Sequence, residues 1–155
     1  GERAPFYSPD ARAGFFGISP HTTRAELQRA VFEGLAFAIV DALQGYPQGG
    51  ELYLTGGGAA SATWLQIIAD CTGRTVVSSA FNELSARGAA ILAARSVAAL
   101  AETPPLAQTR YQPRPQAHAR YAALYPVYRL LREQMLPVWQ ARQAALQPLS
   151  QDLQP

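Results

Sequence analysis

The stretch ELYLTGGGAASATWLQIIADCTG, residues 51–73, decides the fold that the sequence predicts. Its apolar start, residues 52–54, is typical of a short buried strand. Three consecutive glycines, residues 56–58, end this strand, and an apolar-periodic helix follows Ser61. A strand, a glycine turn and a helix in this order indicate an α/β protein.

The glycine turn carries the candidate binding residues of the chain, Gly56, Gly57, Gly58 and Ser61. Because glycine has no Cβ, its backbone can adopt positive φ and approach a flat or anionic ligand closely. The first amides of the following helix have no intrahelical acceptor and lie at the positive end of the helix dipole. The turn therefore indicates a nucleotide or anion site, while a purely structural turn with Ser61 as helix N-cap stays open.

Composition limits the classes of function. A chain of 155 residues that is 48% hydrophobic can form one domain with a core, or a piece of a larger protein. A net charge of +2 favours neither nucleic acid nor a membrane surface as partner. All 13 basic residues are arginine, which excludes Walker A loops and Schiff-base lysines. The single Cys71 indicates a reducing, cytoplasmic compartment, and no apolar run is long enough to span a membrane.

Before the glycine turn, the sequence predicts a strand and a helix. The aromatic run AGFFGIS, residues 13–19, is expected to be a short strand. Thr23 and Glu26 have the spacing of a capping box, which predicts a helix from there to Leu43. The expected buried face of this helix consists of Leu27, Ala30, Val31, Leu35, Ala38, Ile39 and Ala42.

After the glycine turn, Gly73 is expected to end the helix that begins near Ser61. Residues 75–79, TVVSS, predict another buried strand. Residues 83–88 are expected to precede a helix rich in small residues, AAILAARSVAAL, which begins at residue 89 and runs to about residue 101. Residues 103–116 hold four prolines and predict an extended connection.

The last predicted element is a helix over residues 117–145. Pro126 is expected to begin a new segment there, and Pro137 to kink or break the helix. Its expected apolar stripe consists of Tyr121, Leu124, Tyr125, Tyr128, Leu131 and Met135.

Strands and helices alternate along the chain, which predicts parallel strands joined by right-handed helical crossovers. Three strands form a thin sheet with unpaired edges, so further strands are expected before Gly1. The chain also begins with glycine instead of methionine. We therefore expect a piece of a longer polypeptide.

Four blocks of the sequence resemble the FGGY family of carbohydrate kinases, in the family's order. They are GERAPFYSPDARAGFFGIS (residues 1–19), RAELQRAVFEGLAFAIVDAL (24–43), LYLTGGGAASATWLQIIADCTG (52–73) and ELSARGAAILAA (83–94). The tail PQAHARYAALYPVYRLLREQMLPVW, residues 115–139, is similar to the C-terminal helix of xylulokinases, although gluconate and other pentulose kinases end alike.

The resemblance implies a ribonuclease-H-like fold, as in actin and hexokinase, with ATP and sugar bound in the cleft between two such domains. Residues 1–102 would be the latter part of the second domain, residues 103–116 a proline-rich connection, and residues 117–146 a C-terminal helical segment.

The resemblance also implies a role for the glycine turn. Gly57, Gly58 and Ser61, with Gly56 in the same turn, would lie against the adenine and ribose of ATP. Helix-terminus physics alone would place phosphate there. We follow the family, because a flat base needs the close backbone contact that glycine allows. Ala60 stands where the family often has a basic residue, so no nucleotide contact is expected from this side chain.

No catalytic residue is expected in this chain. In the family, the aspartate base and the hairpins that hold the phosphates lie in earlier parts of the polypeptide. Asp70 matches a structural position, and Glu33 is expected to pair with Arg29 four residues earlier on the same helix. His21 and His118 have no metal-ligand partners at suitable spacing, so no protein-bound metal is expected, and Mg²⁺ would be carried with ATP.

The function implied is that of an ATP-dependent sugar kinase that converts D-xylulose to D-xylulose 5-phosphate, with this chain inactive alone. L-ribulose, gluconate or glycerol is the alternative substrate, and a non-catalytic nucleotide-binding or interaction module is the alternative function. The expected partners are a pentulose and the rest of the kinase polypeptide, without nucleic acid or membrane and with a homodimer left open.

Overall fold

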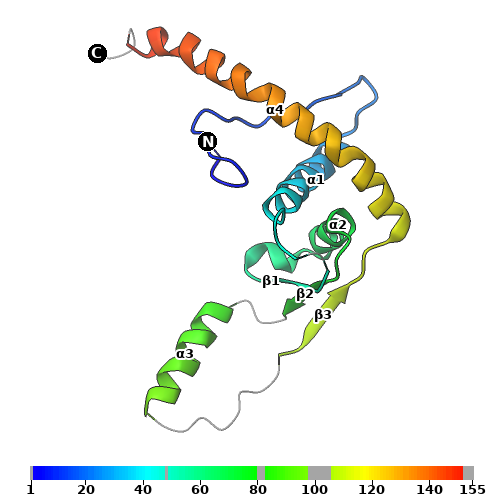
Figure 1. Cartoon of the computed structure of the whole chain (residues 1–155), viewed down its shortest axis with the longest axis vertical. Helices are drawn as coiled ribbons and strands as arrows, with labels where there is room; N and C mark the ends of the chain where they lie inside the picture. The colour runs from blue at the N-terminus through cyan, green and yellow to red at the C-terminus, as the bar shows by residue number, and fades with distance from the viewer. Residues whose placement is uncertain (1, 48, 80–82, 98–105, 152–155) are drawn as a thin grey trace. The chain divides into compact units, whose positions relative to one another are not determined.

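The computed structural model describes residues 2–47, 49–79, 83–97 and 106–151. Its elements follow in the order α1 (Arg24–Ala42), β1 (Leu52–Leu54), the short 3-10 helix η1 (Gly57–Ala60), α2 (Ala62–Thr72), β2 (Val76–Ser79), α3 (Leu84–Val97), β3 (Gln108–Tyr111) and α4 (Pro115–Gln151) (Figure 1).

The chain divides into two compact units. We call Pro47–His118 the sheet unit, and Gly1–Tyr46 together with Ala119–Pro155 the two-helix unit.

The sheet unit holds a three-stranded sheet in the order β1-β2-β3. Strands β1 and β2 are parallel, with Leu52 opposite Val76, and α2 forms the crossover between them, as predicted. Strand β3 runs antiparallel to β2, with Val76 opposite Tyr111. The expectation of parallel strands alone was therefore wrong, and the sheet is mixed.

The third strand also comes from a different part of the sequence than expected. The described residues 13–19 form no strand, whereas Gln108–Tyr111, inside the proline-rich connection, pairs with β2 along its length. Thr109 and Tyr111 favour strand structure, and the prolines flank this strand without interrupting its hydrogen bonds. The division of the chain into a domain part (residues 1–102), a connection (103–116) and a C-terminal helical segment (117–146) otherwise stays a prediction.

The core of the sheet unit lies between α2 and β2. Leu65 and Ile68 of α2 and Val76 and Val77 of β2 are each at most 1% exposed. Consecutive buried residues on β2 show that this central strand is covered on both faces.

Helix α2 ends where the sequence predicts. Gly73 is its C-cap with φ 67°, and the Gly73 amide donates to the carbonyl of Ala69 at 2.9 Å. Few residues other than glycine adopt this left-handed conformation without strain.

The two-helix unit contains α1 and most of α4. The predicted capping box at the start of α1 is confirmed, because the Thr23 amide donates to Glu26 Oε2 at 2.7 Å and the Glu26 amide donates to Thr23 Oγ1 at 3.3 Å. The Phe37 ring packs against three rings of α4, with centroid distances of 5.2–5.9 Å to Tyr121, Tyr125 and Tyr128.

The buried face of α1 differs from the predicted one. Ala36, Phe37 and Asp41 are buried, whereas Val31 is 50% and Leu35 53% exposed. The tyrosines of α4 account for the difference, because they need an aromatic partner for their rings and acceptors for their hydroxyls. Phe37 and Asp41 provide these on the neighbouring side of α1.

Helix α4 continues past both prolines that were expected to begin a new segment or to interrupt it. Pro126 and Pro137 are exposed, and the apolar stripe of the helix is half-buried or buried except for Leu124, which is 53% exposed. Packing along this stripe compensates for the hydrogen bonds that the prolines remove.

Helix α3 has no buried residue within its described range, and the predicted continuation to residue 101 lies outside the described residues. None of the described helices is both long and apolar enough to cross a membrane.

Candidate functional site

The glycine turn leads directly from β1 into η1 and then α2. Leu54 at the end of β1 is paired with Ser78 near the end of β2, so both parallel strands end at the same edge of the sheet. In open α/β sheets, ligands bind beyond the carboxyl ends of the strands. The turn that the sequence singled out therefore lies at the edge where a ligand is expected.

The three glycines of the turn differ in what the fold demands of them. Gly56 has φ 87°, a conformation that favours glycine. A Cβ on Gly58 would lie 3.4 Å from Trp64 Nε1, in van der Waals contact with the indole. Gly57 has no positive φ, and no described atom lies within 4 Å of the position that its Cβ would take. Positive φ gives a reason for glycine at position 56, and Trp64 lies beside position 58, whereas the described structure places nothing near position 57.

Ser61 has a structural role. It is the N-cap of α2, and its Oγ accepts a hydrogen bond from the Trp64 amide at 3.3 Å. Helix geometry leaves the amides of Ala62 and Thr63, the first two of α2, without intrahelical acceptors. A ligand at the turn would therefore meet bare backbone and amide groups.

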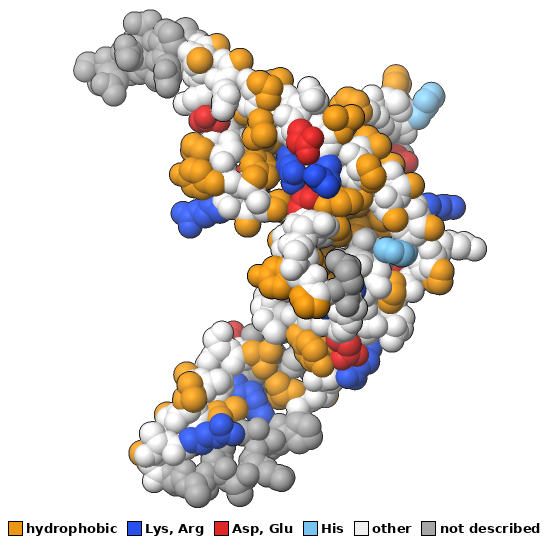
Figure 2. All heavy atoms as spheres, in the orientation of Figure 1, with side chains coloured by type: hydrophobic (Ala, Val, Ile, Leu, Met, Phe, Trp, Pro, Cys, Tyr) orange, Lys and Arg blue, Asp and Glu red, His pale blue; other side chains and the backbone are white. Residues whose placement is uncertain are grey.

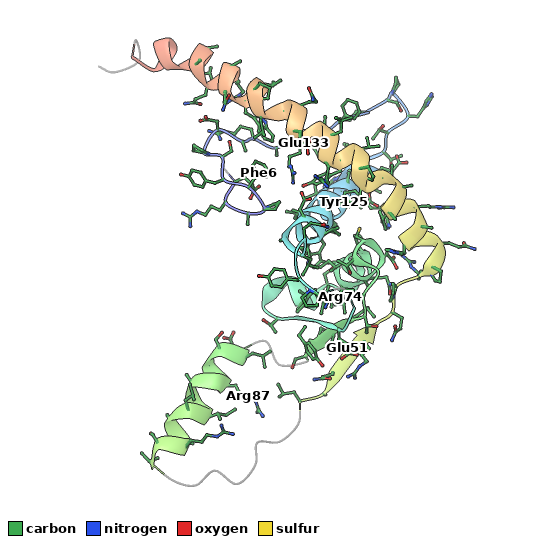
Figure 3. The ribbon with its side chains drawn as sticks, viewed as in Figure 1. Phe6, Glu51, Arg74, Arg87, Tyr125 and Glu133 are labelled. Atoms are coloured by element: carbon green, nitrogen blue, oxygen red, sulfur yellow. The ribbon has the colours of Figure 1, made fainter. Side chains whose placement is uncertain are left out.

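Charged side chains of the sheet unit gather at the opposite edge of the sheet. Glu51 precedes β1 and pairs with Arg110 Nε at 2.9 Å, and Arg74 precedes β2 and donates through Nε to the carbonyl of Gly50 at 3.2 Å (Figure 3). The bond from Arg110 lowers the pKa of Glu51. These groups lie at the amino ends of β1 and β2, away from the glycine turn.

Asp70 is structural, as the sequence indicated. Its side chain is 0% exposed and accepts hydrogen bonds from Arg114 Nη2 at 2.5 Å, Arg114 Nε at 3.0 Å and Gln66 Nε2 at 3.0 Å. Burial alone raises the pKa of Asp70, but these hydrogen bonds outweigh it and hold the pKa below its ordinary value. A carboxylate so fully occupied is unsuited to take a proton from a substrate.

The predicted pair of Arg29 and Glu33 is confirmed, with Nε and Oε1 2.7 Å apart. The structure adds Tyr121, whose hydroxyl accepts from Arg29 Nη2 at 2.7 Å and donates to Glu33 Oε1 at 2.7 Å. Burial and the bond to Glu33 raise the pKa of Tyr121 to about 12. These residues join α1 to α4 within the two-helix unit.

Neither histidine belongs to a metal site in the described part of the chain, where no group of three potential ligands occurs. His118 Nδ1 lies 2.9 Å from the carbonyl oxygen of Asp70. The His21 amide donates to Ser19 Oγ at 3.2 Å.

Sequence reasoning missed the partners that residues 112–118 provide to α2. Arg114 stands between Pro113 and Pro115, and proline is favoured at the first position of a helix. That pattern could have identified the start of α4 at Pro115. It carries no sign that Arg114 reaches Asp70, 44 positions earlier.

Comparison with known proteins agrees with the family resemblance. The chain is 36% identical to the erythritol kinase of Brucella abortus (strain 2308) over 149 residues, which cover 90% of this chain and 28% of that protein. It is 34% identical to the xylulose kinase of Escherichia coli (strain K12) over 149 residues, or 89% of this chain and 31% of that protein. The chain thus spans about 30% of the length of these relatives.

The fold matches a solved structure. The ligand-bound xylulose kinase from Lactobacillus acidophilus superimposes with a TM-score of 0.81 at 24% identity, over 91% of this chain and 31% of that one. Residues 1–97 match the model of the FGGY family of carbohydrate kinases, C-terminal domain. The chain therefore belongs to the FGGY family of carbohydrate kinases and carries part of the family's C-terminal domain.

Proposed function

We propose that this chain forms the nucleoside side of the ATP site in a sugar kinase. The observation that carries the proposal is Gly57, whose missing side chain no described part of the fold explains. A flat adenosine placed against the turn would use the room that a side chain at this position would fill.

Each residue of the turn has a distinct task in this proposal. Gly56 turns the backbone, Gly57 gives the nucleoside close access, and Gly58 lies against Trp64. Ser61 holds the first turn of α2 in place and thereby keeps the turn in one conformation. The chain would thus bind and orient ATP.

The phosphoryl transfer itself lies outside these residues. ATP supplies the phosphoryl group, and Mg²⁺ held mainly by phosphate oxygens would accompany it. We assign neither a catalytic base nor a metal ligand to this chain. A cytoplasmic location and a homodimer stay predictions.

For the sugar we propose D-xylulose, phosphorylated at its 5-hydroxyl, because the tail over residues 115–139 is similar to that of xylulokinases. The relatives include kinases named for xylulose and for erythritol. The identity of the sugar that accepts the phosphoryl group is therefore tested separately from the ATP site. A panel of D-xylulose, L-ribulose, erythritol, gluconate and glycerol with the full-length kinase tests it. A higher kcat/KM for any other acceptor would contradict the choice of D-xylulose.

Gly57→Val in the full-length kinase tests the site. The apparent KM for ATP should rise about tenfold, equivalent to about 1.4 kcal/mol, while the KM for the sugar stays unchanged. Gly14→Val is the matched control, because Gly14 also has no positive φ and no described atom near its Cβ position. Equal losses for ATP and sugar in Gly57→Val would show that the glycine serves folding alone.

A further inference from the structure

Residues 112–118 lie along α2 and contact it repeatedly, and we call this segment the clasp. Gln66 Nε2, on α2, donates to the carbonyl of Gln112 at 2.8 Å. Beside it, the Gln112 side chain accepts from Thr75 Oγ1 at 2.9 Å. The clasp is thereby joined to the middle of α2 and to the residue before β2.

Arg114 makes the strongest contact of the clasp. Its backbone amide donates to Asp70 Oδ1 at 2.8 Å, and its guanidinium donates to Oδ2 through Nε and Nη2. Charge-assisted bonds with this planar geometry are directional as well as strong. Because the Asp70 side chain is 0% exposed, loss of Arg114 would leave a buried carboxylate with fewer donors.

His118 closes the clasp at the end of α2. A Cβ built on Gly73 would lie 2.6 Å from His118 Cε1, so the imidazole occupies the space that any other residue would need. The His118 ring also lies 2.9 Å, at Nδ1, from the carbonyl oxygen of Asp70. The clasp therefore contacts the C-terminal half of α2 from Gln66 to its glycine cap.

The clasp lies outside the residues that match the family model, which end at residue 97. It nevertheless supplies the ion-pair partner of Asp70, a buried residue within the matched range. Helix α2 spans only Ala62–Thr72, with the glycine turn before its first residue and the clasp on its second half. A rigid helix of this length transmits a shift at one end to the other.

We propose that the clasp positions α2 and so sets the affinity of the enzyme for ATP, with Arg114 as the main positioning residue. The inference rests on the proposed nucleoside site at the glycine turn. A displacement of about 1 Å at a binding group can cost up to about 100-fold in rate. Loss of the clasp should therefore affect ATP selectively, although the clasp contacts the half of α2 that lies away from the glycine turn.

Arg114→Ala, Arg114→Lys and Arg120→Ala in the full-length kinase test the proposal. Arg114→Ala should raise the KM for ATP about tenfold and leave the KM for the sugar unchanged. Arg114→Lys should rescue part of this loss, because lysine keeps the charge but cannot donate as a planar fork. Arg120→Ala should change neither constant, since Arg120 is exposed and makes no ion pair or hydrogen bond among the described residues.

A folded Arg114→Ala enzyme with an unchanged KM for ATP overturns the proposal, as does an equal rise in both KM values. If that variant does not fold, His118→Ala decides by the same criterion, because it opens space beside Gly73 without leaving a buried charge. Gly57→Val separates the two proposals. If the KM for ATP rises in Gly57→Val but not in Arg114→Ala, the proposal about the clasp is wrong and the proposal of the nucleoside site stands.

Discussion

Each of the two units has its own kind of interior. The sheet unit encloses aliphatic side chains, with Ile68 and Val76 each 0% exposed. The two-helix unit encloses aromatic rings around Phe37, and its tyrosines bring hydroxyls that need partners. Aliphatic burial depends on area and volume alone, whereas buried hydroxyls add a requirement for direction.

Each unit also contains one buried aspartate that is paired with an arginine. Asp70 pairs with Arg114, whose side chain is 60% exposed, and Asp41 pairs with Arg132, whose side chain is 17% exposed. Asp41 also accepts a hydrogen bond from Tyr125. The first pair joins a loop segment to a helix, and the second joins two long helices. In each unit the buried pair thus joins two elements that lie far apart in the sequence.

Both units also expose hydrophobic side chains, among them Leu92 and Val97 of α3 in the sheet unit. Hydrophobic side chains remain exposed on both helices of the two-helix unit. Figure 2 shows hydrophobic side chains, in orange, among the polar ones on one face of the molecule. Those at least half exposed on the two helices are Val31, Leu35, Leu124, Val127, Leu130 and Val138. Deleting such exposed side chains should cost far less than deleting the buried side chains of the sheet unit.

The largest effect is expected from Ile68→Ala in the sheet unit. This change leaves a cavity in a fully buried site and should lower the free energy of unfolding by about 2–5 kcal/mol. Leu35→Ala, on the exposed side of α1, should change it by only about 0.5 kcal/mol. Urea unfolding of the 155-residue chain measures both. Similar losses for the two variants would contradict the contrast between the buried core of the sheet unit and the exposed side of α1.

Gly73→Ala should have the next largest effect. Alanine at φ 67° is strained and its Cβ would collide with His118, so a loss of about 1–3 kcal/mol is expected. Gly57→Ala meets neither obstacle and should stay within about 0.5 kcal/mol of the parent chain. Thermal unfolding compares the two, and an equally destabilised Gly57→Ala would show that this glycine is needed for folding.

Tyr121→Phe tests the polar network of the two-helix unit. The change removes the hydroxyl between Arg29 and Glu33 and should cost about 1–2 kcal/mol. Tyr46→Phe is the control, because Tyr46 is 64% exposed and its hydroxyl has no partner among the described residues. If both variants unfold at the parent's urea midpoint, the hydroxyl of Tyr121 contributes nothing to stability.

The smallest effect near neutral pH, and a clear one in alkali, concerns the ionisation of the tyrosines. Burial together with hydrogen bonds to Glu33 and Asp41 raises the pKa of Tyr121 and of Tyr125 to about 12. The unfolded chain releases these protons near pH 10, so stability should be full below that pH and fall as the pH rises toward 12. Unfolding followed at stepped pH measures this slope, and Tyr121→Phe should make it shallower. An unchanged slope in that variant would show that Tyr121 does not contribute to the loss of stability in alkali.

Local signals account for what could be predicted. The capping box at Thr23 and the C-cap at Gly73 follow from short patterns whose physics lies within a few residues. The parallel pair of β1 and β2 follows from the order strand, helix, strand, which implies a crossover connection. Strand β3 could not be predicted in the same way, because its antiparallel pairing with β2 joins residues that lie 29 to 35 positions apart in the chain.

The sequence by itself determined the α/β class, the glycine turn as the candidate site and the family. These properties follow from the types and spacing of residues, which can be read from the sequence without knowing how the elements pack. Only the tertiary structure decided that Gly57, among three adjacent glycines, has neither a positive φ nor a described atom near its Cβ position. It alone also brought Arg114 and His118 to α2. Contacts between distant segments depend on how whole elements pack, and no local pattern encodes that packing.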